Sequence, residues 1–516
     1  MKSFTRRGVR RSGRPWLTAG MASGVSVILS GGCSSAQTTG LPESLRPEDV
    51  VISDDARPRP PFHFSDEDEA LLDEIEHASF LFFWKAVSPE TGMVYDRTSS
   101  DVISVGGVGF QLSALPIGVE RGWITREEGR ERAVQILSAL EREPTNRKAG
   151  LFYHFLEPDD ARPRRVGAEL VVSTIDSAVL FAGMMTAGSY FGGDVQEIGD
   201  RLWRAADWSF FLHETGEAGL PGGYLSLGWR PTDDADPTGD GALIGYSWID
   251  SGDEHRLVTF MGVSAPEEAH RVPPERYFAL RRQLGTYEGV GPLVWFPYSG
   301  ALFTAFFANC WIDYAHLGVD DPASWGAPAR SRVDWWENSR RTVNLHRAAA
   351  RENARGLPTL GEDAWGLSAC DAPDGYLVAG VFPHRVEMVG AKPERDYATY
   401  VPEDRMGDGT VPPYAAGASI IFEPGAAVAA LRLYRTLCDE LGSPLVWRDP
   451  ADGGYGLRDA FNMRGPDGSP WVAADDVAID HGPMLLGIEN ARTGLIWRLF
   501  ASHPSIRDGL SRLRLE

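Results

Sequence analysis

Apolar residues recur along most of this chain with the spacing of helices that bury one face. After Ser65, an acidic first turn precedes apolar residues at positions 71, 72, 75, 80 and 83, which share one side of a helix. Comparable patterns predict helices near residues 105–121, 125–142, 173–191, 195–213, 254–262, 299–316, 324–352, 412–421, 425–441, 479–490 and 494–501. The alternation typical of strands is scarce, so the pattern predicts an all-α protein of about twelve helices.

These helices favour a closed ring over an open stack. An open helical solenoid would repeat a fixed pattern with a period of about 34 residues, and no such repeat is present. We therefore predict an (α/α)6 barrel, a toroid of paired helices in which long Gly- and Pro-containing loops form one concave site. No segment after residue 61 has the composition of a linker, so residues 65–516 are predicted to form a single domain.

The N-terminus has the composition of an export signal. Residues 1–32 contain six basic residues and no acidic one, and their apolar run is too short and too rich in Gly and Ser to span a bilayer permanently. Residues 5–9 resemble a twin-arginine signal, and residues 29–33 resemble a bacterial lipoprotein processing site. We expect lipidation at Cys33, with residues 33–64 as a tether to a periplasmic or cell-surface domain. The alternative is plain secretion.

Charge and residue types exclude several classes of function. The net charge is −22, and removal of residues 1–32 would make it −28. A surface this acidic repels nucleic acid and anionic lipid, so we expect no nucleic-acid partner and membrane contact only through the lipid anchor. The chain has no Gly-rich phosphate loop and no motif of a serine hydrolase or zinc protease, and Cys310, Cys370 and Cys438 are too widely spaced for a disulfide framework or a metal site. We therefore expect neither a cofactor nor a metal, while the oligomeric state stays open.

The chemistry that the chain does offer is carboxylates beside aromatic residues in Gly-rich loops. A neutral sugar polymer needs this combination, because acidic groups cleave the glycosidic bond and flat aromatic faces hold sugar rings. The chain also contains a series of short sequence motifs. They are Asp96-Arg97, the stretches 105–110, 118–123 and 152–155, Glu169 with residues 173–178, and the stretches 336–341, 365–369, 407–413, 459–462, 480–483 and 488–495.

Taken in order, these motifs resemble the glucoamylase-like family of bacterial secreted proteins over roughly residues 70 to 500. Within that family they are most similar to the endo-β-1,2-glucanases of glycoside hydrolase family 144 and to the related domain of cyclic β-1,2-glucan synthases. The resemblance implies an (α/α)6 barrel and hydrolysis of a β-1,2-linked glucan polysaccharide or oligosaccharide with inversion. Residues 248–254 and the pair Thr304-Ala305 depart from the family pattern, which leaves a changed substrate preference open.

Three carboxylates are candidates for catalysis. Spacing relative to the family motif favours Glu254, and the resemblance adds Glu169 and Asp176. An inverting hydrolase needs one protonated and one ionised carboxyl group, and a pair of Glu254 with Glu169 or Asp176 fits a geometry across the site. The simpler interpretations are that Asp176 caps a helix with Ser173 and that Glu169 pairs with nearby arginines. If Glu254 is the wrong choice, the second carboxylate is sought at Asp250, Asp253 or Asp480.

The candidate substrate-binding residues come from the same motifs and from the tryptophans. They are Asp96, Arg97, His154, Trp229, Trp248, Trp365, Asp408, Asp480, Glu489 and Asn490, and Trp471 is a fourth tryptophan that could hold a sugar ring. Each has a structural alternative: an Asp96–Arg97 ion pair, a hydrogen-bonding His154, tryptophans within the core, or a partner such as Arg492 for Glu489. Two classes of function remain, a β-1,2-glucan hydrolase, including exo-acting or transglycosylating variants, and a glycan-binding lipoprotein that has lost catalysis.

Overall fold

The computed structural model describes residues 47–216, 222–297, 299–383, 385–387 and 406–515, and this part of the chain contains fourteen α-helices. Five helices made mostly of small and apolar residues are buried along nearly their whole length. They are α2 (Val105–Glu120), α4 (Thr174–Phe191), α6 (Asp253–Ser264), α10 (Pro413–Ala418) and α12 (Ala478–Arg492). A helix that is buried on all sides belongs inside the fold, so these five form the inner ring.

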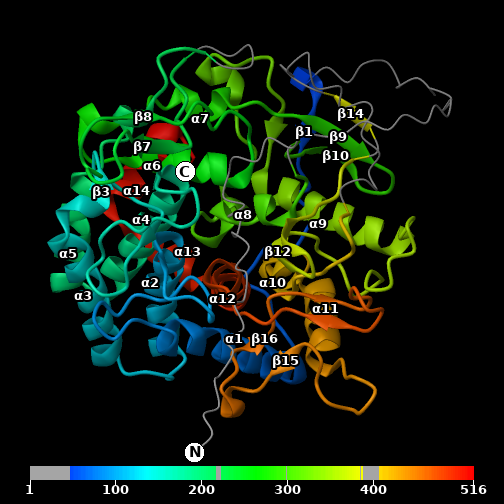
Figure 1. The fold of residues 1–516 in the computed structure, drawn as a ribbon. Coiled ribbons are helices and arrows are strands. Elements are labelled where there is room, and N and C mark those ends of the chain that lie inside the picture. Colours follow the sequence, from blue (N-terminus) through cyan, green and yellow to red (C-terminus); the bar gives the residue numbers. More distant parts are fainter. Residues whose placement is uncertain (1–46, 217–221, 298, 384, 388–405, 516) are drawn as a thin grey trace, which may run out of the picture.

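Contacts between neighbours close this ring (Figure 1). Helix α4 packs against α2 and α6, and α12 packs against α2 and α10. Two 3-10 turns, η5 (Leu302–Ala305) and η6 (Ala308–Cys310), contact α6 and fill the sixth position. The ring of Phe306 meets the ring of Tyr414 edge-on at a centroid distance of 6.1 Å, which joins these turns to α10.

The outer helices carry a polar face and pack around the inner ring. They are α1 (Asp66–Lys85), α3 (Arg126–Arg142), α5 (Gly193–Arg204), α9 (Trp335–Glu352), α11 (Pro424–Thr436), α13 (Leu495–Ser502) and α14 (Pro504–Leu513), with two short helices, α7 (Glu275–Ala279) and α8 (Tyr314–Leu317). Each of the seven contacts an inner element, for example α3 with α2 and α11 with α10. The predicted all-α barrel is therefore confirmed.

Several predicted helices differ from the structure. The helix expected over 195–213 ends at Arg204, and the one expected over 425–441 ends at Thr436. The helix expected over 299–316 is broken into η5, η6 and α8, because the backbone N–H groups of Ala308 and Asn309 donate to the Asp253 carboxylate, at 2.6 and 3.3 Å, instead of continuing a helical ladder. The helix expected to begin at residue 324 begins at Trp335, where Asp334 caps it. Helix α14 was not expected.

Short strands fasten the loops that lead into the inner helices. Three groups of strands involve the segments just before α2, α4 and α12. They are β2 (Ile103–Ser104) with β5 (Phe155–Leu156), β6 (Val172–Ser173) with β7 (Gly228–Pro231) and β8 (Gly241–Leu243), and β17 (Phe461–Asn462) with β18 (Trp471–Val472). The others are β1 (Val51–Ile52), β3 (Arg147–Lys148), β4 (Leu151–Phe152), β9 (Leu284–Tyr287), β10 (Gly291–Val294), β11 (Arg332–Val333), β12 (Ala369–Ala372), β13 (Gly375–Val378), β14 (Arg385–Glu387), β15 (Trp447–Arg448) and β16 (Gly456–Leu457). All pairs except β1 with β11 are antiparallel.

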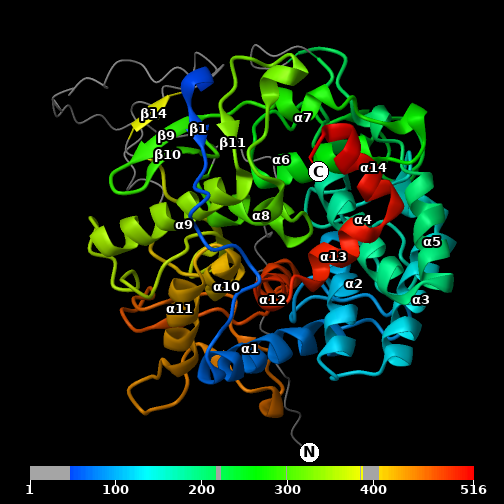
Figure 2. The same cartoon turned by 180° about the vertical axis from the view of Figure 1, so that it is seen from behind.

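The segment before α1 is part of the domain, which corrects the expected boundary at residue 65. Strand β1 pairs in parallel with β11, Arg59 forms an ion pair with Asp334 at 2.7 Å, and the N–H of Phe62 donates to the carbonyl of Ala491 at 2.7 Å. Figure 2 shows this blue segment running down the outside of the barrel from β1 to α1. The expected export signal and Cys33 lie outside the described residues. No helix in the described part of the chain is long and apolar enough to cross a membrane.

Candidate active site

The starts of four inner helices are fastened to one another at one end of the ring. Arg97 forms a backbone bridge with the residue before α12, and Val105, the first residue of α2, donates its N–H to the carbonyl of His154 at 3.0 Å. The indole N–H of Trp248, which lies shortly before α6, donates at 2.7 Å to the hydroxyl of Thr174, the first residue of α4. Carboxylates in the first turns of these helices are therefore brought to a common end of the barrel.

Glu254 is the second residue of α6, and its carboxyl group lies in an unusual environment. Its residue is 9% exposed, and its oxygens form no hydrogen bond or ion pair with any described residue. Burial, reinforced by the nearby charges of Asp176 and Asp253, raises the pKa of Glu254 to about 8. The group is therefore protonated at neutral pH and able to donate a proton.

Asp176, in the first turn of α4, lies in a different environment. Its Oδ2 accepts a hydrogen bond from the Ser173 hydroxyl at 2.5 Å, and its Oδ1 lies 3.6 Å from Nε2 of His154. On balance the pKa of Asp176 is raised, because burial outweighs the lowering by His154 and the Ser173 hydroxyl. Gly106, in the first turn of α2, leaves the space that Oδ1 occupies, since a Cβ there would meet Oδ1 at 2.7 Å. Glu254 has no such partners for its ionised form, so Asp176 is the one favoured to carry the charge.

Glu169 also belongs to this cluster. Its Oε1 lies 2.6 Å from Nδ1 of His154, so His154 stands between Glu169 and Asp176. The alternative that Glu169 pairs with nearby arginines is wrong, because Arg164 pairs with Asp101 and Glu157 and Arg165 pairs with Asp234. The helix-capping interpretation of Asp176 is correct in part, since the Ser173 hydroxyl also accepts from the N–H of Asp176 at 3.3 Å.

A second acidic cluster lies at the start of α12. Asp459 and Asp480 are buried close enough for their charges to interact, and one oxygen of each lacks a hydrogen-bond partner among the described residues. Burial, with a contribution from Asp371, raises the pKa of Asp459 to about 6, and burial and Asp459 raise the pKa of Asp480. Two carboxyl groups in this arrangement compete for a single proton. Asp480 therefore remains a candidate for substrate contact or for proton transfer.

Asp96 and Arg97 form the ion pair that the sequence suggested, at 3.2 Å, and Arg97 also binds Asp371 at 3.1 Å. Arg97 thereby supplies a positive charge near the second acidic cluster. Asp408 is exposed just before α10, where its Oδ1 accepts from the N–H of Thr410 at 2.9 Å. These three residues stay candidates for substrate binding.

Three of the four tryptophans expected to hold sugar rings lie in the core, which corrects the expectation for these three, whereas Trp471 is half-buried and stays a candidate. Trp229, Trp248 and Trp365 are 2%, 3% and 0% exposed, so none offers a free face for a sugar. Lys148 lies over the ring of Trp229, with its Nζ 4.8 Å from the ring centroid, and the indole of Trp248 stands edge-on to His255. The presence of tryptophans in loops therefore does not distinguish rings that line a site from rings that pack in the core beneath it.

Glu489 and Asn490 are also displaced from the expected site, because they lie at the opposite, C-terminal end of α12. Glu489 accepts from Nε of Arg121 at 2.8 Å, and Asn490 donates to the carbonyl of Cys310 at 2.9 Å. Arg492, suggested as the partner of Glu489, binds Glu76 at 2.7 Å instead. Both residues therefore support the barrel and do not contact substrate.

Two of the alternative carboxylates are also structural. Asp250 binds Arg281 through its Oδ2 at 2.7 Å, and both residues are buried. Asp253 forms a buried ion pair with Arg256 and accepts the backbone bonds that break the 299–316 segment. Neither carboxylate is free to act on a substrate.

Sequence reasoning did not select Asp371 and Asp459 as site residues. Asp459 accepts from the N–H of Asp371 at 2.8 Å, a contact between residues 88 positions apart. Residues 459–462 form one of the motifs that resemble the family, so the sequence indicates Asp459 as a possible site residue, whereas nothing in the sequence indicates Asp371. Among the described residues no group of three or more His, Cys, Asp or Glu side chains could hold a metal ion.

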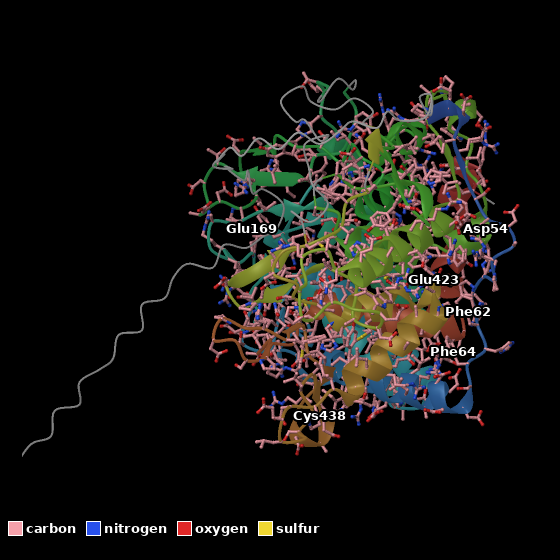
Figure 3. The ribbon with its side chains drawn as sticks, turned by 90° about the vertical axis from the view of Figure 1, so that its right-hand side faces the viewer. Asp54, Phe62, Phe64, Glu169, Glu423 and Cys438 are labelled. Atoms are coloured by element: carbon pink, nitrogen blue, oxygen red, sulfur yellow. The ribbon has the colours of Figure 1, made fainter. Side chains whose placement is uncertain are left out.

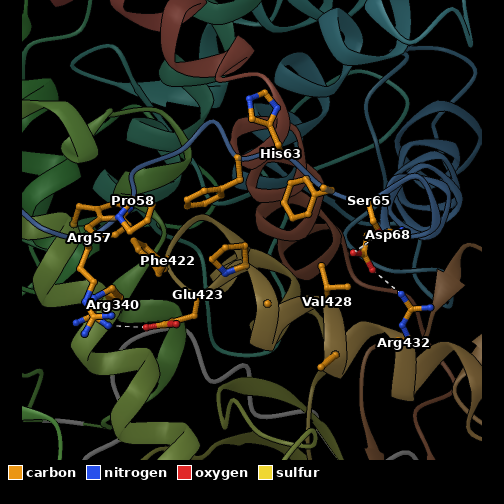
Figure 4. A pocket seen from close by; sticks show the side chains of 16 residues that line it. Arg57, Pro58, His63, Ser65, Asp68, Arg340, Phe422, Glu423, Val428 and Arg432 are labelled. Atoms are coloured by element: carbon orange, nitrogen blue, oxygen red, sulfur yellow. Dashed lines mark hydrogen bonds and ion pairs between the residues drawn. The ribbon is translucent and has the colours of Figure 1, made fainter.

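A pocket of about 630 Å³ lies on the face opposite Glu169 (Figure 3). Phe62, Phe64 and Phe422 line it, and its charged side chains are paired with each other, Arg340 with Glu423 at 2.7 Å and Arg432 with Asp68 at 2.6 Å (Figure 4). Although large, this pocket contains none of the carboxylates with raised pKa values. The carboxyl groups with raised pKa values at the starts of α4, α6 and α12 therefore make the other end of the barrel the candidate active site.

Comparison with known proteins agrees with the fold and the motifs. The model of the putative glucoamylase family matches residues 246–504, half of the chain. The chain belongs to this family. It is 28% identical over 485 residues to an exo beta-1,2-glucooligosaccharide sophorohydrolase (non-reducing end) of Parabacteroides distasonis, and the match covers 87% of this chain and 58% of that relative. The chain thus spans less than two thirds of the length of the curated relative.

Solved structures of family members superpose over most of the chain. A putative glucoamylase from Bacteroides uniformis is 27% identical with a TM-score of 0.68, covering 88% of this chain and 98% of the other. A beta-1,2-glucanase from Parabacteroides distasonis is 25% identical with a TM-score of 0.69, covering 88% of this chain and 60% of the other. An endo-beta-1,2-glucanase from Chitinophaga pinensis, 24% identical with a TM-score of 0.66 and covering 87% and 98%, shares the fold.

Proposed function

We propose that the chain is a glycoside hydrolase that cleaves β-1,2-linked glucan by an inverting mechanism with two carboxyl groups. The linkage is supported by the relatives, which are named for β-1,2-glucans and their oligosaccharides. The reaction class is supported by one observation above all: Glu254 is buried, has no bonding partner among the described residues, and has its pKa raised to about 8. A carboxyl group held neutral in this way at neutral pH is what a general acid requires.

Glu254 acts as the general acid in this proposal. Its proton passes to the glycosidic oxygen as the bond from that oxygen to C1 of the sugar breaks, so the leaving chain departs as a neutral alcohol. Glu254 is left ionised. Because burial opposes this ionised form, Glu254 regains a proton readily for the next turnover.

Asp176 acts as the general base. It takes a proton from the water molecule that attacks C1 on the opposite face of the sugar, and the new hemiacetal has the inverted configuration. The Ser173 hydroxyl and His154 support its ionised form. Asp480 is a further candidate for proton transfer, because one of its oxygens lacks a hydrogen-bond partner in the described part of the chain, but its raised pKa suits a proton donor better than a base.

The direct test is Glu254→Gln, assayed on linear β-1,2-glucan with product sizes read by chromatography. We expect turnover to fall at least about 100-fold, the lower end of general acid contributions, with the thermal midpoint within a few degrees. Glu268→Gln, the same change at an exposed position, is the matched control and should keep full activity. Full activity in Glu254→Gln would show that Glu254 is not the acid.

The assay also separates this proposal from its alternatives. A protein that binds glycan without catalysis would bind the polymer but release no product. An exo-acting enzyme would release one short product from the first time points, whereas an endo-acting enzyme would shorten the whole polymer before short products accumulate. The curated relative is named as exo-acting, so we propose release of disaccharide from a chain end as the first outcome to examine.

We further propose that the protein is exported and anchored by a lipid on Cys33. This proposal is supported by the basic start, the short apolar run and the small residues before the cysteine. The docking of residues 50–64 onto the barrel shortens the predicted tether to the residues before them.

A further inference from the structure

His154 occupies an unusual position in the acidic cluster, because each of its ring nitrogens faces a carboxylate. Nδ1 lies 2.6 Å from Glu169 and Nε2 lies 3.6 Å from Asp176. The side chains of all three residues are mostly buried, and the imidazole stacks on Phe155 with a centroid distance of 3.8 Å. Three residues from three different stretches of the chain thus form one row from Glu169 through His154 to Asp176.

The backbone holds this row in place. The N–H of His154 donates to the carbonyl of Val171 at 2.8 Å, and its carbonyl accepts from Val105 at 3.0 Å, so the imidazole is fixed between the loops before α2 and α4. Glu169 lies in a tight turn in which its backbone exchanges two hydrogen bonds with Val166, at 2.9 and 3.0 Å. The backbone N–H and C=O groups of His154 and Glu169 are all hydrogen-bonded, so these two side chains are well suited to hold a neighbouring side chain in place.

The surrounding charges all favour a protonated imidazole. The acidic groups that act on it are Asp96 from the loop before α2, Glu169 from the loop before α4, and Asp176 from α4, and Asp176 in turn acts on Glu254 of α6. Burial lowers the pKa of His154, but Asp176 and Glu169 outweigh burial and raise it to about 9. His154 therefore carries a positive charge beside Asp176 at neutral pH.

We propose that Glu169 and His154 are positioning residues: Glu169 holds His154 protonated and oriented, and His154 keeps the carboxylate of Asp176 ionised and aimed as the base. This inference rests on the proposed function. It assigns Glu169 a role through His154 instead of direct catalysis, and it assigns His154 a role other than substrate contact.

The first test needs no substrate. In protein labelled with 13C in its histidine rings, the ring signal of His154, assigned by its loss in His154→Gln, should titrate with a midpoint near pH 9 in the wild-type chain. Glu169→Gln keeps an acceptor for Nδ1 but removes the charge, so the midpoint should fall by about one pH unit or more. Glu157→Gln, which removes a neighbouring glutamate that binds Arg164, should leave it unchanged. A midpoint that is the same in Glu169→Gln and wild type would overturn the proposal.

The second test is the pH profile of kcat/KM on β-1,2-glucan. Asp176 must be ionised to act as a base, so activity falls as the pH drops through its pKa. Removing the positive charge in His154→Gln raises that pKa, and the acidic limb should move up by about one pH unit or more while the alkaline limb stays in place. If His154→Gln lost the same fraction of activity at every pH, the proposed effect of His154 on Asp176 would be wrong. The titration of His154 in the first test would not be affected by that outcome. If neither the wild type nor any variant cleaves glucan, the proposed function is wrong. The titration still tests the Glu169–His154 pair, because it needs no substrate.

Discussion

Asp253 and Glu254 are adjacent buried acids at the start of α6, and we expect opposite consequences when each is replaced by its amide. Asp253 binds Arg256 in a fully buried ion pair and accepts the N–H groups of Ala308 and Asn309. Arg256 is itself enclosed, with its guanidinium 3.8 Å from the ring centroid of Trp335. In Asp253→Asn this charge stays buried without its counterion.

The magnitude follows from that burial. Breaking one partner of a buried ion pair costs about 3 to 5 kcal/mol, because the remaining charge is uncompensated. The backbone bonds to Ala308 and Asn309 also weaken when their acceptor is no longer charged. Glu254 has no partner among the described residues to lose, so Glu254→Gln should change the free energy of unfolding little while removing activity.

Urea unfolding of both variants, followed by circular dichroism, checks this contrast. We expect the unfolding midpoint of Asp253→Asn to shift well below that of the wild type and the midpoint of Glu254→Gln to stay close to it. An Asp253→Asn protein that unfolds like the wild type but has lost activity selectively would mean that the two acids have been assigned to the wrong roles.

Three further outcomes follow from the structure. Because Glu254 must be protonated to act and its pKa is about 8, kcat/KM should fall about tenfold per pH unit above pH 8, and a profile flat to pH 10 would exclude it as the acid. Asn490→Ala removes a donor to the buried carbonyl of Cys310, so the free energy of unfolding should drop by about 1 to 3 kcal/mol with KM unchanged; a raised KM at full stability would restore Asn490 to the site. Cys33→Ala should move the protein from the membrane fraction to the soluble fraction, and unchanged fractionation would refute the lipid anchor.

The sequence predicted the barrel well because outer helices bury one face, which leaves a signal in the spacing of apolar residues, and inner helices such as α2 and α4 are long runs of small and apolar residues. Helices α2, α3 and α4 begin and end within about one residue of the predicted ranges. The 299–316 segment fails because its conformation is decided by a carboxylate from α6, some fifty residues away in the sequence, and not by its own apolar pattern.

The candidate site was predicted less completely, for a related reason. The family motifs indicated Glu169, Asp176 and His154. In the structure, Nδ1 of His154 lies 2.6 Å from Glu169 and its Nε2 lies 3.6 Å from Asp176. The same resemblance also selected Glu489, because a residue that supports the barrel at its far end is part of the motif as much as one that contacts substrate. Only the fold shows which end of α12 lies at the candidate site.

The most direct test of the central claim is the configuration of the first product, measured by 1H NMR of the anomeric protons while the wild-type protein acts on linear β-1,2-glucan. An inverting reaction at a β-linkage, with Glu254 as acid and a second carboxylate activating water, predicts that the α-anomer of the new reducing end appears first and then mutarotates. A β-anomer formed first, or no new reducing end at all, would contradict the account.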